Sequence, residues 1–221
     1  FSQVDRVEIF EAQVSELVRV STLDYRFHDQ TLLAPLWAGC VPPERADALI
    51  RKQIFSRQRY WQAYGIMASA TCPDSEASRY CETTWLPWNQ LVGEGLLHYG
   101  ERALAAELMG RIMEAITQSL RRDGAFRKHY HAKTGEGIGE RNALSGLPPL
   151  GLFLQTLGVE LISPWKVRLA GENPYPWNVT LRYRGLTVLR GTDETIVTFP
   201  DGRSVKVEDP APCLVRGRPG A

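Results

Sequence analysis

Residues 124–149, GAFRKHYHAKTGEGIGERNALSGLPP, concentrate candidate chemistry in a glycine-rich stretch. Its five glycines interrupt helical and strand periodicity, so we expect an irregular connection between two helices. Long connections of this kind in compact domains are commonly functional, and the alternative is a loop whose charges are only solvated. The stretch therefore predicts the position of the active site. Its titratable side chains are Lys128, His129, His131, Glu136, Glu140 and Arg141.

Helical periodicity surrounds this connection. Apolar residues recur every three or four positions over residues 4–18, 42–54, 85–99 and 101–122, and a further apolar helix is expected over 145–158. Residues 31–39 are apolar all round and are expected to be buried, whereas residues 60–80 have no sustained period and are expected to be irregular. Helices that alternate in pairs with long loops favour helix hairpins arranged around an axis.

The apolar period changes from near four to two after Ser163, which indicates short antiparallel strands. Pro200-Asp201-Gly202 is a strong hairpin turn signal between two of them. We therefore expect a mainly α protein with a helical segment over residues 1–162, a small antiparallel β appendage over 163–209 and a disordered tail over 210–221. The helices are too few to close a ring and the chain opens on Phe1, so we expect the C-terminal part of a longer protein.

Composition excludes several classes of protein. Hydrophobic residues make up 43% of the 221 residues and charged residues 23%, an ordinary globular balance. The net charge is +1 with no basic stripe, and no apolar run approaches the roughly 20 residues of a membrane span, so neither nucleic acid nor membrane is an expected partner. The four cysteines lack CxxC spacing, so we expect free thiols in a reducing, cytoplasmic location. No P-loop or dinucleotide fingerprint is present, and no cofactor is expected.

The segment around Trp85 has the residue types of a sugar site. Trp85, Trp88 and Asn89 stand at the entry of a predicted helix, and Pro87 restrains the backbone there. An indole stacks on the apolar face of a pyranose, and an amide can bond its hydroxyls. For Trp88, spaced with the apolar side of the helix, a core position is favoured. Trp85 and Asn89 are predicted substrate contacts, with a core role as the alternative.

Carboxylates in the central stretch are candidates for catalysis. Glycoside hydrolysis with inversion needs an acid and a base, with carboxyl groups about 6.5–9.5 Å apart. Glu140, followed by Arg141 at the mouth of the next helix, is the better candidate, and Glu136, between two glycines, is the second. Glu82 is a third carboxylate near the predicted site. Solvation at the surface is the alternative for Glu136 and Glu140.

Two histidines flank Tyr130 in the same stretch. An extended backbone would send His129 and His131 to the same side. A metal site would need a third ligand, and none has suitable spacing, so no metal is expected. His129, Tyr130 and His131 are instead predicted to contact the substrate.

Three stretches carry a resemblance to a known group of enzymes. LLAPLWAGCVPPERADAL at 32–49, TWLPWNQLVGEGLLHYG at 84–100 and FRKHYHAKTGEG at 126–137 are similar to segments of (α/α)6-barrel glycoside hydrolases. The group includes trehalase, mannosyl-oligosaccharide glucosidase, mannosylglycerate hydrolase and amylo-α-1,6-glucosidase-like proteins. NPYPWNVTLRYRGLTVLRG and TFPDG resemble the β tail of the debranching-like members. The resemblance implies an incomplete (α/α)6 toroid, a carbohydrate substrate and an inverting mechanism that activates water.

One departure from the family pattern bears on function, and three hypotheses stay open. Lys128 occupies the position of the water-activating carboxylate, and a charged ammonium cannot accept a proton. The first hypothesis is an α-glucosidase or α-mannosidase that uses Glu140 or another displaced carboxylate, with its acid supplied by the missing N-terminal half or another chain. The second is a non-catalytic sugar-binding or structural relative that has lost its base. A third is an interaction module in which the β tail docks a partner.

Overall fold

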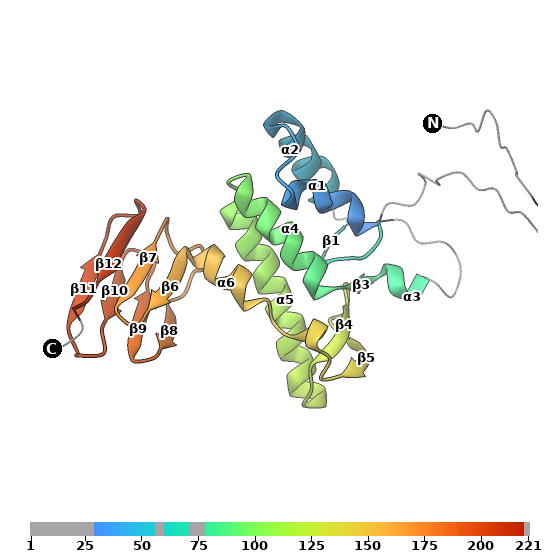
Figure 1. The fold of residues 1–221 in the computed structure, drawn as a ribbon. Coiled ribbons are helices and arrows are strands. Elements are labelled where there is room, and N and C mark those ends of the chain that lie inside the picture. The colour runs from blue at the N-terminus through green and yellow to red at the C-terminus, as the bar shows by residue number, and fades with distance from the viewer. Residues whose placement is uncertain (1–28, 56–59, 71–77, 219–221) are drawn as a thin grey trace, which may run out of the picture.

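The computed structural model describes residues 29–55, 60–70 and 78–218 (Figure 1). A helical part and a part built from antiparallel strands lie side by side, joined through α6. The described chain is therefore mixed α and β rather than mainly α as predicted. The predicted helix over 4–18 lies outside the described residues. No described helix is both long and apolar enough to span a bilayer.

The helical part confirms the helices predicted on both sides of the central stretch, with small shifts at their ends. A π-helical turn, Ile50–Ile54, continues the second helix, and 3-10 turns cover Gln30–Leu33 and Leu144–Gly146. The α-helices are α1 (Ala34–Trp37), α2 (Pro43–Leu49), α3 (Ser78–Cys81), α4 (Leu86–His98), α5 (Arg102–Asp123) and α6 (Leu150–Leu157). Residues 60–70, expected to be irregular, instead include the hairpin of β1 (Trp61–Gln62) and β2 (Gly65–Ile66).

Two glycines make α4 the centre of the helical part. A Cβ atom on Gly95 would lie 2.9 Å from the backbone nitrogen of Trp37, and one on Gly93 would lie 2.5 Å from Leu152. Both distances are shorter than a side chain tolerates, so these glycines let α1 and α6 approach α4 closely. Leu36 and Leu96 are completely buried in this core, which confirms the predicted burial of part of the run 31–39. Trp37, in the same run, is 50% exposed.

Residues 124–149 are not irregular as predicted, because most of them form a hairpin. Strand β3 (Thr83–Thr84), strand β4 (Arg127–His131) and strand β5 (Gly137–Arg141) make a three-stranded antiparallel sheet in that order. Gly135 has a φ of +71° in the turn, and its N–H donates to the carbonyl of His131. Glycine here supplies the turn of a hairpin instead of interrupting strands, a role that a count of glycines cannot reveal.

The β part is two small antiparallel sheets. The hairpin turn predicted at 200–202 is confirmed between β10 and β11. One sheet has the order β12-β7-β6 and the other β11-β10-β9-β8. The strands are β6 (Val159–Ser163), β7 (Lys166–Leu169), β8 (Val179–Tyr183), β9 (Leu186–Arg190), β10 (Thr195–Thr198), β11 (Ser204–Val207) and β12 (Cys213–Arg216).

The expectation of a disordered tail over 210–221 is wrong for residues 213–216. Strand β12 pairs with β7 in antiparallel register, and Val215 is buried in the core of the β part. The side of β7 that does not pair with β6 supplies hydrogen-bond partners for this segment despite its proline and glycine content. The β part also begins earlier than the predicted boundary at 163, because β6 starts at Val159 directly after α6.

Helix α6 joins the two parts through buried polar contacts. The Arg190 guanidinium, 5% exposed, donates from Nε to the carbonyl of Leu157 over 3.0 Å and from Nη1 to Thr195 over 2.6 Å. Arg102 of α5 donates to the carbonyl of Thr156 over 2.8 Å. Gly158 ends α6 with a φ of +65°, as its position after the apolar helix predicted.

Replacing Gly158 with alanine is expected to lower the free energy of unfolding by at least about 2 kcal/mol. The new Cβ would stand 1.7 Å from the carbonyl oxygen of Ala170, on a backbone that L-residues disfavour. Gly151→Ala in the same helix is the matched control, since a Cβ there meets nothing within 4 Å. Urea denaturation measures both variants, and equal midpoints would contradict this account.

Candidate active site

Strands β3 and β4 bring the two predicted halves of the site together. Thr83 pairs with His131 and Thr84 with Tyr130, so the segment before Trp85 lies directly beside the histidine-containing strand. Alternation along β4 places His129 and His131 on the same face, as predicted, with Tyr130 on the other. The register therefore joins residues that are 46 and 48 positions apart in the sequence.

The indole of Trp85 stacks on the imidazole of His129. The ring centroids lie 4.3 Å apart with an interplanar angle of 19°. The indole N–H donates to the Thr83 hydroxyl over 2.7 Å, which fixes the plane of the ring. His129 is 6% exposed, and its Nδ1 has no partner among the described residues. Burial, and secondarily the charge of Lys128, lowers the pKa of His129, so the imidazole is neutral near pH 7.

Glu82, His131 and Lys133 form a polar cluster beside the stacked pair. Lys133 Nζ lies 2.5 Å from one carboxylate oxygen of Glu82, and His131 Nε2 lies 3.4 Å from the other. The hydrogen bond from Lys133 is the main reason that the pKa of Glu82 is lowered. Glu82 is thus the carboxylate that the structure places next to predicted substrate contacts. Lys133 was missed, and only the hairpin geometry of residues 131–137 reveals it.

Asn89 and Tyr130 lie beneath the site, where both are completely buried. The Asn89 amide accepts from the Ile66 N–H over 2.7 Å and donates to the carbonyls of Ile66 and Trp85 over 2.9 and 3.0 Å. The Tyr130 hydroxyl donates to the carbonyl of Gly146 over 3.1 Å. In this structure both side chains hold the scaffold, and their contact with a substrate stays a prediction.

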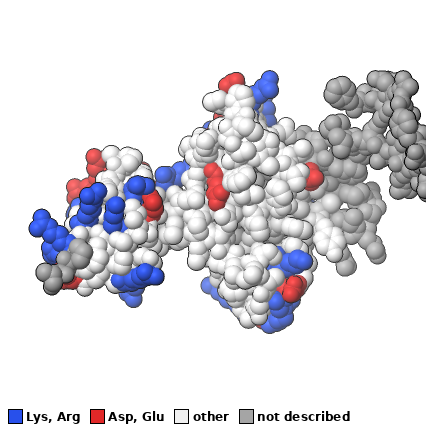
Figure 2. All heavy atoms as spheres, viewed as in Figure 1, with Lys and Arg blue, Asp and Glu red and all other residues white. Residues whose placement is uncertain are grey.

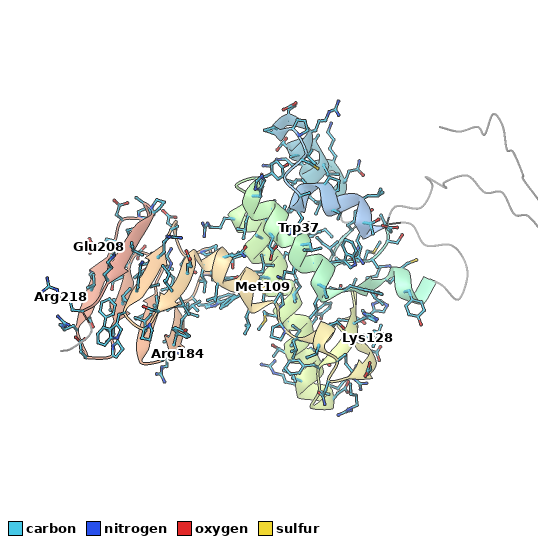
Figure 3. All side chains as sticks on the ribbon, in the orientation of Figure 1. Trp37, Met109, Lys128, Arg184, Glu208 and Arg218 are labelled. Atoms are coloured by element: carbon cyan, nitrogen blue, oxygen red, sulfur yellow. The ribbon has the colours of Figure 1, made fainter. Side chains whose placement is uncertain are left out.

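The two predicted catalytic carboxylates lie on the exposed side of the β4–β5 hairpin. Glu136 pairs with Arg122 at 3.4 Å. Glu140 is exposed and bonds to no described residue. Lys128 is also exposed, and its Cβ lies opposite Gly139, the neighbour of Glu140. Figure 2 shows acidic and basic side chains intermixed at this end of the helical part, and Figure 3 places Lys128 there.

The described residues contain no set of side chains that is arranged to bind a metal ion. No group of three or more histidine, cysteine, aspartate or glutamate side chains among residues 29–55, 60–70 and 78–218 is arranged to hold an ion. The site can instead present a stacked aromatic surface, a paired carboxylate and exposed carboxylates nearby.

Comparisons with known proteins place these elements in a family. Residues 21–146 match the family model described as trehalase. The chain is similar in structure to neutral trehalase Nth1 from Saccharomyces cerevisiae, at 21% identity over 59% of this chain and 24% of that one, with a TM-score of 0.47. GH63 mannosylglycerate hydrolase from Thermus thermophilus, solved with glucose, shares 30% identity over 57% of this chain and 31% of its own, with a TM-score of 0.46.

A third solved structure concerns the fold alone. A sialidase shares 10% identity over 86% of this chain and 20% of its own length, with a TM-score of 0.54. The chain therefore spans less than a third of the length of each of these three proteins. No curated protein matches the chain.

Asn89→Ala is expected to lower the free energy of unfolding by about 2–4 kcal/mol, since it leaves the buried N–H and carbonyl of Ile66 without partners. Gln90→Ala serves as a control, because Gln90 bonds only to Glu94 one turn away and its loss should change stability by less than about 0.5 kcal/mol. Chemical denaturation measures both. Similar values for the two variants would show that the amide does not hold the hairpin.

The stability of the chain is expected to fall as the pH drops below about 6.5, the ordinary histidine pKa. The pKa of His129 is lower in the folded chain than in the unfolded chain. As the pH falls, the unfolded chain therefore binds a proton at His129 before the folded chain does, and this stabilises the unfolded state relative to the fold. His129→Phe keeps a ring against Trp85 and should flatten this slope between pH 7 and 5. Lys128→Gln removes the nearby positive charge, which is the smaller cause of the lowered His129 pKa, and should flatten the pH dependence of stability less than His129→Phe does. An unchanged slope in His129→Phe would assign the acid sensitivity elsewhere.

Proposed function

Because this chain belongs to the trehalase family, we propose that it is part of a glycoside hydrolase that cleaves an α-glucosidic or α-mannosidic bond. The observation that carries the proposal is the stacked pair Trp85–His129 beside the polar cluster Glu82–His131–Lys133. All five residues fall inside the part of the chain that matches the family model.

The stacked pair suits the apolar face of a sugar. A pyranose packs its C–H groups against an indole, and an uncharged imidazole beneath the indole avoids placing a cation under the ring. Burial keeps His129 in that neutral form. Glu82 and Lys133 offer an acceptor and a donor for hydroxyl groups, because each retains hydrogen-bonding capacity beyond their mutual bond.

Glu140 is our proposed base for an inverting reaction. It is exposed on β5, bonds to no described residue and can therefore hold a water molecule, whereas Glu136 is paired with Arg122. The reaction also needs a general acid at a separation of about 6.5–9.5 Å. We propose that the rest of the same protein, or another chain, supplies this acid and the helices that complete an (α/α)6 toroid in the cytoplasm.

Loss of catalysis is the second candidate, and Lys128 favours it. Its ammonium is exposed on β4 at the position where the family pattern has a carboxylate. In that case the face around Trp85 would bind sugar without turnover.

Glu140→Gln in the full-length protein is expected to lower kcat for α-glucosides or α-mannosides by about 10²–10⁴-fold, the usual contribution of a general base. Glu44→Gln, which removes an acidic side chain at the start of α2, should leave kcat unchanged. Steady-state hydrolysis assays measure both.

Two results would decide against this base. Wild-type turnover by Glu140→Gln would reject Glu140. Sugar binding without turnover by the wild-type protein, together with turnover gained in Lys128→Glu, would establish the relative that has lost its base.

A further inference from the structure

A groove of about 550 Å³ lies outside the candidate site, between α5 and the loop 174–177 that precedes β8. Its α5 wall runs from Ala103 to Glu114. Glu114 and Gly124 are ten residues apart, which is about 15 Å along a helix, and β4 begins only after Gly124. In Figure 3, Met109 marks this part of α5 near α6, whereas Lys128 lies at the other end of the helix.

One wall of the groove is an aromatic surface held rigidly. The Trp177 side chain is 57% exposed, and its indole stacks on Tyr175 with centroids 5.4 Å apart. The Asn173 amide donates to the Trp177 carbonyl over 2.9 Å and accepts from the Tyr175 N–H over 3.0 Å. Pro174 and Pro176 restrict the backbone on either side of Tyr175. The indole is therefore presented in one orientation before any ligand arrives, which lowers the entropy lost on binding.

The opposite wall supplies charged groups in fixed positions. Arg111 donates from Nε and Nη2 to a single oxygen of Glu107, over 3.1 and 2.7 Å. Its guanidinium also lies over the Trp61 ring, 5.3 Å from the centroid, so it cannot swing freely. The second oxygen of Glu107 bonds to no described residue. Glu114 is exposed and likewise has no partner among the described residues. These carboxylate oxygens can accept bonds from hydroxyl groups.

The α5 wall of the groove contains a glycine that packing does not explain. Gly110 stands in the middle of the 22-residue helix α5, where glycine is the least favourable residue apart from proline. A Cβ on Gly110 would meet nothing within 4 Å. The lack of a side chain at Gly110 therefore leaves space in the groove and is not needed to avoid a clash within the described chain.

We propose that this groove is a second carbohydrate site that binds a neutral oligosaccharide. One pyranose packs on the Trp177 indole, and its hydroxyls donate to Glu107 and Glu114 across the space that Gly110 leaves open. Two carboxylates against one paired arginine disfavour an anionic ligand. A purely apolar ligand would bury Glu114 and the second oxygen of Glu107 without hydrogen-bond partners. The site would hold part of a long glycan on the protein and raise its local concentration at other sites.

The test uses the full-length protein carrying Trp85→Ala, so that binding at the candidate active site is weakened. Calorimetry and saturation-transfer NMR measure the affinity for maltoheptaose and for a linear α-mannan oligosaccharide. We expect Trp177→Ala to weaken binding of one of these probes at least tenfold. Trp37→Ala, which removes a similarly exposed indole from α1, should leave it unchanged.

Gly110→Ala is expected to change stability and affinity in opposite directions, which would not happen if Gly110 served only the structure of α5. Its Tm should rise by about 2–4 °C, because alanine favours the helix, while its affinity for the sugar falls. Gly110→Leu should abolish binding. Glu140→Gln should leave sugar binding in the groove unchanged, because Glu140 does not line it. The hydrolysis assay and the binding assay can therefore reject the proposed hydrolysis and the proposed groove site independently.

Four outcomes would overturn the proposal. The first is no binding of either probe at millimolar concentration, and the second is equal affinity in Trp177→Ala and Trp37→Ala. The third is unchanged affinity in Gly110→Leu. Binding of a proline-rich peptide that a saturating sugar does not displace would also reject a carbohydrate ligand.

Discussion

The buried amide of Asn89 satisfies both the N–H and the carbonyl of Ile66 inside the helical core, and the candidate site depends on that contact. A third bond, to the Trp85 carbonyl, ties the same amide to the residue that begins α4. The β1–β2 hairpin, the start of α4 and the position of the indole are thus fixed together. Gly65 allows this approach, because a Cβ there would stand 2.9 Å from the amide oxygen.

Burial and charge then set the chemistry above this scaffold. His129 is removed from water by the ring of Trp85 and lies next to Lys128, and both effects oppose its protonation. The hydrogen bond from Lys133 lowers the pKa of Glu82 and so favours its ionised form. An uncharged aromatic surface therefore stands next to a stable anion. That combination suits a neutral ligand with hydroxyl groups better than a phosphate or a peptide.

The sequence pointed to several residues that the fold brings together, but it did not reveal how they are arranged. Trp85, His129 and His131 could be chosen because indole and imidazole groups stood near carboxylates in family-like segments. Asn89 looked equally suited to bind a sugar, yet its partner Ile66 lies 23 residues earlier, on a hairpin too short for strand periodicity to reveal. Lys133 reaches Glu82 from 51 residues away, which no local pattern encodes.

Local patterns in the sequence determined the helices, the change to strands and the ends marked by glycine. Apolar spacing along α5 and Gly158 after α6 each express a constraint within a few residues. The tertiary structure decided what depended on distant partners. Residues 127–131 and 137–141 became strands because they pair with each other and with β3, and residues 213–216 became an edge strand because β7 offered backbone groups to pair with. Hydrogen bonds between strands are made across the fold, so composition along one segment cannot specify them.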